Sequence, residues 1–353
     1  MTERATDSAR RIKLDQLDQQ MIEMLHRDGR RSVASLARAL GVTNQTVTKR
    51  LDRLLSRDAI RITVRVDPVA LGFPLFWSVG VRVKPGAANR VAAEFASMDD
   101  VAWVGRSTGG FDVMIEVFLP DTDAVFEFLN TRLAEMPDIV ATREWLVLRS
   151  AKYEYLWESD GTGPESARST QEAEGGDGAR EPVHGWTTKP GSQRDLVRVD
   201  DLDREIIRLL RQDGRRPLAD IARRVNVAEG TVASRVERLL RGGAMQVIAH
   251  VNWPAIGYPV HVNVGIGITR GQVVQVGERL AAQPNVSYVG YTTGDFDVVA
   301  EAFLPDNASL LEFIDADVAA IPAVESIETW HVLQVAKVNY EWEGERISTR
   351  RPS

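Results

Sequence analysis

Two short segments of the sequence place carboxylates, threonine hydroxyls and glycines in the same order. These groups suit an amino acid, because a carboxylate pairs with an ammonium group and backbone N–H groups receive a carboxylate. The same glycines also suit a tight turn, since glycine tolerates positive φ. An effector site and a purely structural turn are therefore both open interpretations. The two segments consist of Thr108, Gly109, Gly110, Phe111 and Asp112, and of Thr293, Gly294, Asp295, Phe296 and Asp297.

The two segments differ at one position, which is Gly110 in the first and Asp295 in the second. Both keep an aspartate after the phenylalanine, as Asp112 and Asp297, and a turn alone does not require a carboxylate there. Because the first segment has one carboxylate fewer, we expect the second to be the better site for the ammonium group of an amino acid.

Hydrogen-bonding and cationic side chains recur from Thr43 to Arg57. Such a helix face can contact base edges and phosphates of DNA, although a solvated surface helix has a similar composition. The charges sum to +3 there and to +1 from Ala228 to Gly242, so we expect the first segment to bind DNA more strongly. The candidate DNA-binding residues are Thr43, Asn44, Gln45, Thr46, Thr48, Lys49, Arg50 and Arg53 in the first segment, and Thr231, Ser234, Arg235 and Arg238 in the second.

The second segment also begins less favourably as a helix. Ala228 stands where the first segment has Thr43, and loss of such a capping side chain costs about 1 kcal/mol. Gly230 replaces Gln45 and adds up to about 1 kcal/mol if it is helical. Glu229 places a negative charge where a phosphate or base edge would lie.

Three predicted helices position the polar face of the first segment. The first helix carries apolar residues on one side from Leu17 and ends at Asp28-Gly29. Ser32 can begin a second, short helix that Gly41 ends, and Thr43 can begin the third. The turn between the last two is only about three residues long, which predicts a helix-turn-helix arrangement.

Alternating strands and helices follow this unit. Gly109-Gly110 joins two expected strands and predicts a hairpin. The order βαββαβ is that of a ferredoxin-like unit, whose uncovered sheet face must pack on something, most simply another copy of itself. Strands are expected at 75–83, 101–108, 111–119 and 139–148, and helices at 87–98 and from Asp121 to Pro137.

The whole arrangement occurs twice. A shift of 185 residues aligns Leu17–Trp157 (module one) with Leu202–Trp342 (module two) without a gap, and about 52 of 141 positions are identical. The segment between the modules has seven glycines and no Ile, Leu, Phe or Met, which predicts a disordered linker. The predicted fold class is α+β. The predicted domains are two helix-turn-helix (winged-helix-like) domains at 12–66 and 195–251, two ferredoxin-like effector and oligomerisation domains at 67–158 and 252–343, and the linker at 159–194.

Composition narrows the functional classes. The chain has 353 residues, no cysteine and a formal net charge of −7, so DNA binding must rest on local charge. The absence of cysteine excludes a disulfide framework and a cysteine nucleophile. No apolar run approaches the roughly 18 residues of a membrane span. The five histidines are scattered without metal-ligand spacing, and no catalytic set stands out, so we expect no enzyme, no metal and no cofactor.

A helix-turn-helix followed by a βαββαβ unit resembles the Lrp/AsnC (feast/famine) family of bacterial and archaeal transcriptional regulators. The stretches that carry the resemblance are "LDQLDQQMIEMLHRDGR", "LARALGVTNQTVTKRLDRL" and "STGGFD" with "FLPD", each with a counterpart in module two. Usual members have one module, so this chain resembles a tandem version. The resemblance implies a ligand-binding domain that dimerises through its sheets, assembles further and often senses amino acids beside the Gly-x-Phe-Asp loop.

The expected function is therefore that of a sequence-specific DNA-binding transcriptional regulator that responds to a small effector. The alternative is an amino-acid sensor or assembly protein with partly decayed DNA-binding domains. The expected partners are double-stranded DNA, an amino-acid-like effector and further copies of the chain, without a membrane and in the cytoplasm. The linker can span about 30–36 Å, so we expect the modules of one chain to pair in place of the usual dimer.

Overall fold

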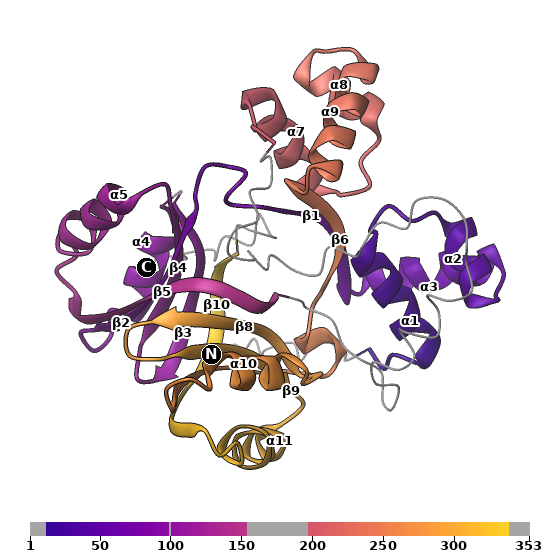
Figure 1. Cartoon of the computed structure of the whole chain (residues 1–353). Coiled ribbons are helices and arrows are strands. Elements are labelled where there is room, and N and C mark those ends of the chain that lie inside the picture. The colour runs from indigo at the N-terminus through magenta and orange to yellow at the C-terminus, as the bar shows by residue number, and fades with distance from the viewer. Residues whose placement is uncertain (1–11, 99, 154–196, 339–353) are drawn as a thin grey trace, which may run out of the picture.

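The computed structural model describes residues 12–98, 100–153 and 197–338. The predicted linker at 159–194 lies outside these residues. Each module contributes a helix-turn-helix domain and a ferredoxin-like domain, and the two ferredoxin-like domains form one closed sheet of eight strands. Figure 1 shows the two sets of helix-turn-helix helices projecting away from this sheet on either side of β1 and β6.

The first helix-turn-helix domain has the boundaries that its capping residues predict. The Ser32 side chain accepts a hydrogen bond from the Ser35 backbone N–H, and that of Thr43 accepts one from the Thr46 N–H. Gly41 ends the second helix in the left-handed region with φ of 67°, where glycine is favoured. The elements are α1 (Gln16–Arg27), α2 (Val33–Leu40), α3 (Asn44–Ser56) and the strand β1 (Ile60–Val66).

The second helix-turn-helix domain repeats this arrangement with weaker caps. Pro217 and Ala228 make no side-chain capping bond, and Asn226 takes the left-handed position of Gly41. The missing cap at Ala228 is the one predicted from the sequence. The elements are α7 (Asp201–Gln212), α8 (Leu218–Val225), α9 (Glu229–Arg241) and the strand β6 (Met245–Val251).

Strands β1 and β6 pair with each other and join the two helix-turn-helix domains. They form a two-stranded antiparallel ribbon in which Thr63 lies opposite Ile248, and α1 packs on β6 while α7 packs on β1. The Gly29 N–H donates to the Val247 carbonyl at 2.8 Å, and the Gly214 N–H donates to the Ile62 carbonyl at 2.9 Å. Each domain therefore completes its core with the strand of the other module.

The Asp-Gly motifs that end α1 and α7 are required by this exchange. A Cβ atom on Gly29 would lie 3.0 Å from the Ile248 nitrogen, so the strand could not approach so closely past a larger residue. Two arginines hold the motifs reciprocally: Arg30 Nε donates to the Gly214 carbonyl at 2.8 Å, and Arg215 Nε donates to the Gly29 carbonyl at 2.7 Å.

The ferredoxin-like units follow the predicted order βαββαβ. The expected helix after Asp121 is a short α-helix that continues as a π-helical turn at Phe128–Arg132. Module one supplies β2 (Leu75–Val83), α4 (Ala88–Ala96), β3 (Val101–Gly109), β4 (Val113–Leu119), α5 (Thr122–Glu127) and β5 (Ile139–Tyr153). Module two supplies β7 (Val260–Ile268), α10 (Val273–Ala281), β8 (Val286–Thr293), β9 (Val298–Leu304), α11 (Asn307–Glu312) and β10 (Val324–Val338), with a 3₁₀ turn at Pro254–Ile256 before them and a π-helical turn at Phe313–Ala319.

The two units close into a barrel within one chain, in the order β10-β3-β4-β2-β5-β8-β9-β7 with β7 returning to β10. The last strand of each unit makes the joint: β5 pairs with β8, and β10 pairs with β3. The pairing explains why β5 runs to Tyr153, beyond the predicted end at Leu148. The predicted pairing of the two modules of one chain is confirmed.

The helices of the barrel domains lie outside the closed sheet (Figure 1). Separate apolar cores fill the space between the helices and the sheet in module one and in module two. A third cluster fills one end of the barrel interior, where Phe111, Trp145, Phe296 and Trp330 are in contact. No helix in the described part of the chain is long and apolar enough to cross a membrane.

Candidate nucleic-acid interface and effector groove

The N-terminal half of α3 presents a polar surface. Thr43 and Thr46 use their hydroxyls on each other and on the helix end, with 2.9 Å between the two oxygens. Lys49 has no carboxylate partner among the residues that the structure describes. The side chains of Asn44, Gln45, Thr48 and Lys49 are exposed to solvent. Its exposed predicted residues are Thr43, Asn44, Gln45, Thr48, Lys49 and Arg53.

Two of the predicted DNA-contacting arginines have partners inside the domain. Arg50 Nη1 lies 2.8 Å from Oδ1 of Asp18, a side chain with no exposed surface, and 2.7 Å from Asp15 Oδ2. Arg53 also binds Asp18. A buried carboxylate requires such partners, so Arg50 and Arg53 fasten α3 to α1. This corrects the charge balance of +3, because most of that charge is neutralised inside the domain.

Module two repeats this network of ion pairs between its first and third helices. Arg235 Nη1 lies 2.7 Å from Asp200 Oδ2 and 3.0 Å from the buried Asp203 Oδ1, and Arg238 also binds Asp203. The hydrogen bond from Arg235 lowers the pKa of Asp200 to about 2. Arg235 and Arg238 thus have the same structural role as Arg50 and Arg53.

The exposed face of α9 is poor in cations. Thr231 and Ser234 are exposed, as predicted for DNA contacts, and Ser234 stands where module one has Lys49. Arg241 pairs with Glu237 on the same helix. The two recognition helices therefore differ chiefly in Lys49 and in the N-terminal residues.

The aspartates that follow the phenylalanines of the two loops bind backbone. Asp112 Oδ2 accepts a hydrogen bond from the Val83 N–H at 2.9 Å, and Asp297 Oδ2 accepts one from the Ile268 N–H at 2.7 Å. Each bond ties its loop to the end of a neighbouring strand. The sequence offered no signal for this role, which accounts for the aspartate in both copies.

The remaining loop residues have structural roles in the barrel. Phe111 and Phe296 are buried in the aromatic cluster of the interior. Gly109 and Gly294 have φ of 103° and 114°, which favours glycine. Thr108 pairs with His331 of β10, and Thr293 with Leu146 of β5. The structural interpretation of these glycines and phenylalanines therefore holds.

Asp295 has a partner from the other module. Its Oδ2 lies 2.6 Å from Nε of Arg143, and Nη1 of Arg143 lies 2.9 Å from Oε2 of Glu328. Gly110 leaves room for that glutamate, because a Cβ atom there would lie 2.2 Å from Glu328 Oε1. Asp295, the predicted partner of an effector's ammonium group, is thus bonded to a cation of the other module in this structure.

A groove of about 640 Å³ lies beside the loop of module one. Arg82, Lys84 and Asp112 give it charges of both signs, and the first turn of α4 reaches it at Ala88. The helix begins at Ala87 without a side-chain cap, so no side chain satisfies its first N–H groups. The groove is lined by Arg82, Val83, Lys84, Pro85, Gly86, Ala88, Asp112, Val140 and Ala141.

The corresponding surface of module two has different chemistry. Gly267 and Thr269 stand in place of Arg82 and Lys84, and Glu325 in place of Val140. The Thr269 hydroxyl donates to Glu325 Oε1 at 2.9 Å, which joins the two sides of this surface. Module two keeps one cation in this loop, Arg270 at the position of Pro85, so the groove of module one has two cationic groups where module two has one.

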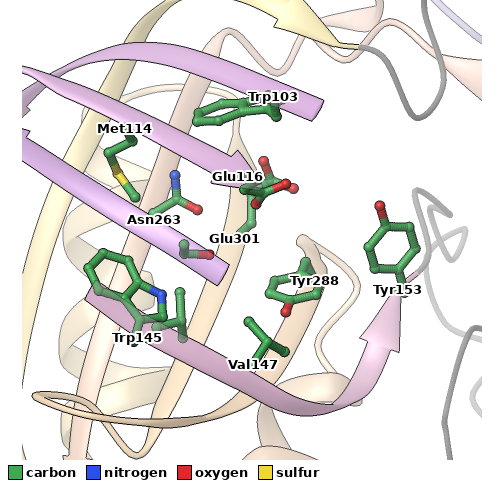
Figure 2. Close-up of a pocket in the computed structure, with 11 residues that line it drawn as sticks. Trp103, Met114, Glu116, Trp145, Val147, Tyr153, Asn263, Tyr288 and Glu301 are labelled. Carbon is green, nitrogen blue, oxygen red and sulfur yellow. The ribbon is translucent and has the colours of Figure 1, made fainter. Parts of the chain in front are cut away.

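The middle of the barrel is polar but has little space (Figure 2). Glu116, Glu301 and Tyr288 line a cavity of about 20 Å³, which is enough for about one water molecule. Glu301 is held by His261 Nε2 at 2.6 Å and by the Ser287 hydroxyl at 2.7 Å. Among the described residues, no group of three or more His, Asp and Glu side chains could hold a metal ion.

Two known domain families match this chain, and each of them matches once in each module. The AsnC-type helix-turn-helix domain matches residues 14–55 and 199–240, and the Lrp/AsnC ligand binding domain matches residues 78–157 and 261–342. An uncharacterised HTH-type transcriptional regulator of Pyrococcus abyssi is 37% identical over 145 residues, which cover 41% of this chain and 92% of that protein. The HTH-type transcriptional regulator FL11 of Pyrococcus furiosus is 32% identical over 144 residues, covering 40% and 93%.

Solved structures of one protein resemble nearly the whole chain. The siroheme decarboxylase NirDL has a TM-score of 0.54 and 14% sequence identity, and the match covers 94% of this chain and 95% of that one. At this identity the likeness concerns the fold, and a fold alone does not determine function. With the domain matches covering both modules, the chain belongs to the Lrp/AsnC family of helix-turn-helix transcriptional regulators, as a tandem form with two helix-turn-helix and two ligand-binding domains.

Proposed function

We propose that this chain is a sequence-specific DNA-binding regulator that presents α3 and α9 to DNA as an unequal pair. The observation that carries the proposal is the β1–β6 ribbon, which joins the two helix-turn-helix domains across an approximate two-fold axis. A pair of recognition helices joined in this way suits two half-sites on one face of the duplex.

The two half-sites need not have the same sequence. Asn44 and Gln45 begin the exposed face of α3, whereas Glu229 and Gly230 occupy these positions on α9. An amide side chain can bond an adenine edge, and a carboxylate repels phosphate. We therefore expect α3 to make most of the base contacts.

Footprinting of fragments recovered by genome-wide mapping of bound DNA tests this proposal. The expected operator has one strongly protected half-site and one weakly protected half-site of different sequence. Thr43→Ala should weaken protection of the strong half-site only. A palindromic operator with equal protection of both halves contradicts the unequal pair, and a lack of any preferred sequence supports the alternative of a sensor with decayed DNA-binding domains.

We further infer that the groove of module one binds the effector, and that this effector is an amino acid. Arg82, Lys84 and the uncapped start of α4 would receive its carboxylate. Asp112, which lines the same groove, would lie near its ammonium group. The apolar lining from Val140 and Ala141 would contact its side chain.

Calorimetric titration with a panel of amino acids tests the effector site. Loss of one charged hydrogen bond of roughly 1.5–3 kcal/mol corresponds to about 10- to 150-fold in affinity, so Arg82→Ala should weaken binding by that factor. Arg270→Ala, in the corresponding loop of module two, is the matched control and should leave affinity unchanged. Equal losses in both variants, or no binding of any amino acid to the wild type, would contradict the assignment.

We also propose that several chains assemble further. Phe126 on α5 and Leu311 on α11 occupy corresponding positions and are 69% and 63% exposed, and exposed apolar side chains at two related sites suit contacts with further copies. Light scattering at micromolar concentration should show species larger than one chain. Phe126→Ser with Leu311→Ser should reduce them to single chains, and a wild type that is already a single chain contradicts this part.

A further inference from the structure

The two Gly-x-Phe-Asp loops meet at one end of the barrel, where a single side chain covers both. The guanidinium carbon of Arg143 lies 5.3 Å from the ring centre of Phe111 and 5.1 Å from that of Phe296. Because these phenylalanines occupy corresponding positions in the two modules, Arg143 lies close to the approximate two-fold axis that relates them. Only one guanidinium can occupy that place.

The residues around Arg143 are complementary across this axis. Glu328 stands in module two where module one has Arg143, and Asp295 stands where module one has Gly110. Arg143 bonds both carboxylates, at 2.6 Å to Asp295 and 2.9 Å to Glu328. We call Arg143, Asp295, Glu328 and Gly110 the axis cluster. Each module thus supplies what the other lacks.

Pairing of like modules would lose this complementarity. Two copies of module one would bring two Arg143 guanidiniums to the same two phenylalanine rings without a carboxylate from the cluster. Two copies of module two would bring Asp295 and Glu328 together twice without a cation. Like charges placed so close cost free energy, and unpaired charges lose their hydrogen bonds.

We propose that the axis cluster is a pairing determinant, by which the barrel face of module one accepts module two and rejects a second module one. The partner that this surface fits is therefore a module with acidic residues at the positions of Asp295 and Glu328. The linker raises the effective concentration of the correct partner, but it does not distinguish like from unlike pairs between chains, whereas the cluster does. The consequence is that every closed barrel carries one α3 and one α9.

Four variants of the full chain test the proposal by melting temperature. The first has Glu328→Arg with Asp295→Gly and reproduces the axis of a module-one pair. The second has Arg143→Glu with Gly110→Asp and reproduces the axis of a module-two pair. The third combines all four substitutions and exchanges the cluster between the modules. The fourth, Glu278→Arg with Asp315→Asn on the outer helical layer, changes the net charge by +3 as the first variant does, but away from the axis, and so controls for the charge change alone.

The two variants that mimic like pairs should melt at least about 2–4 °C below the wild type. The melting temperature of the variant with the exchanged cluster should lie within about 1 °C of that of the wild type, because the same contacts form at the positions related by the two-fold axis. High salt should raise the melting temperature of the like-pair variants more than that of the control, since it screens exposed like charges. An exchanged variant that melts as low as the like-pair variants, or like-pair variants that melt with the wild type, would overturn the proposal.

Discussion

Lys49 is the residue whose removal should change DNA binding most clearly. It is exposed on α3 and has no carboxylate partner among the described residues, whereas Arg50 and Arg53 bind the buried Asp18. Each lysine that contacts a phosphate contributes about 0.9 to the slope of log K against log salt concentration. Lys49→Ser should therefore weaken operator binding about eightfold at 0.1 M salt and about fourfold at 0.2 M.

The matched variant is Ser234→Lys, at the corresponding position of α9. If α9 lies against the duplex, this change should steepen the slope by about 0.9 and partly restore binding when combined with Lys49→Ser. Fluorescence anisotropy of a labelled operator between 50 and 200 mM salt measures the slopes, and thermal unfolding checks that the variants are folded. An unchanged slope for Lys49→Ser would refute the assignment of Lys49 to a phosphate, and an unchanged slope for Ser234→Lys would place α9 away from the backbone.

Three further outcomes follow from the contacts of the helix-turn-helix domains. Arg53→Ala should lower the unfolding free energy by about 1–2 kcal/mol, measured by denaturant titration, because the buried Asp18 loses one of its two cationic partners. Arg235→Ala should raise the pKa of Asp200 from about 2 toward its ordinary value, as measured by NMR titration. In the wild type, the ion pair stabilises the fold at pH values above the ordinary pKa of an aspartate, and this stabilisation is lost as the pH falls toward 2. Ala228→Thr should stabilise module two by about 1 kcal/mol by restoring a cap, and no change in its melting temperature would contradict the capping argument.

Local signals in the sequence predicted most of the elements. Ser32, Gly41 and Thr43 bound the helices of module one as expected, and Ala228 makes no capping bond. Strand β2 has the predicted limits, Leu75–Val83. These features depend on neighbouring residues, so a single sequence contains them.

Contacts between the modules could not be predicted in the same way. Strand β1 completes its pairing with β6 of the other module, and nothing within Ile60–Val66 identifies that partner. Asp295 is a second case, because its partner Arg143 belongs to the other module. Arg50 is missed for a different reason, since its partners Asp15 and Asp18 belong to the same module but lie 35 and 32 residues away in the sequence. In each case the sequence identifies the charged residue but does not identify its partner.

The tandem arrangement itself explains why such partners exist. In a symmetric dimer of identical chains, every contact from residue i to residue j is repeated from j to i, so a charge placed on the axis meets its own copy. Duplication within one chain removes that requirement, because positions 143 and 328 can change independently. The axis could then acquire an arginine opposed by two carboxylates, which no dimer of identical modules can hold. The same independence applies to positions 49 and 234 on the recognition helices, so unequal DNA contacts and unlike pairing have one origin in the duplicated chain.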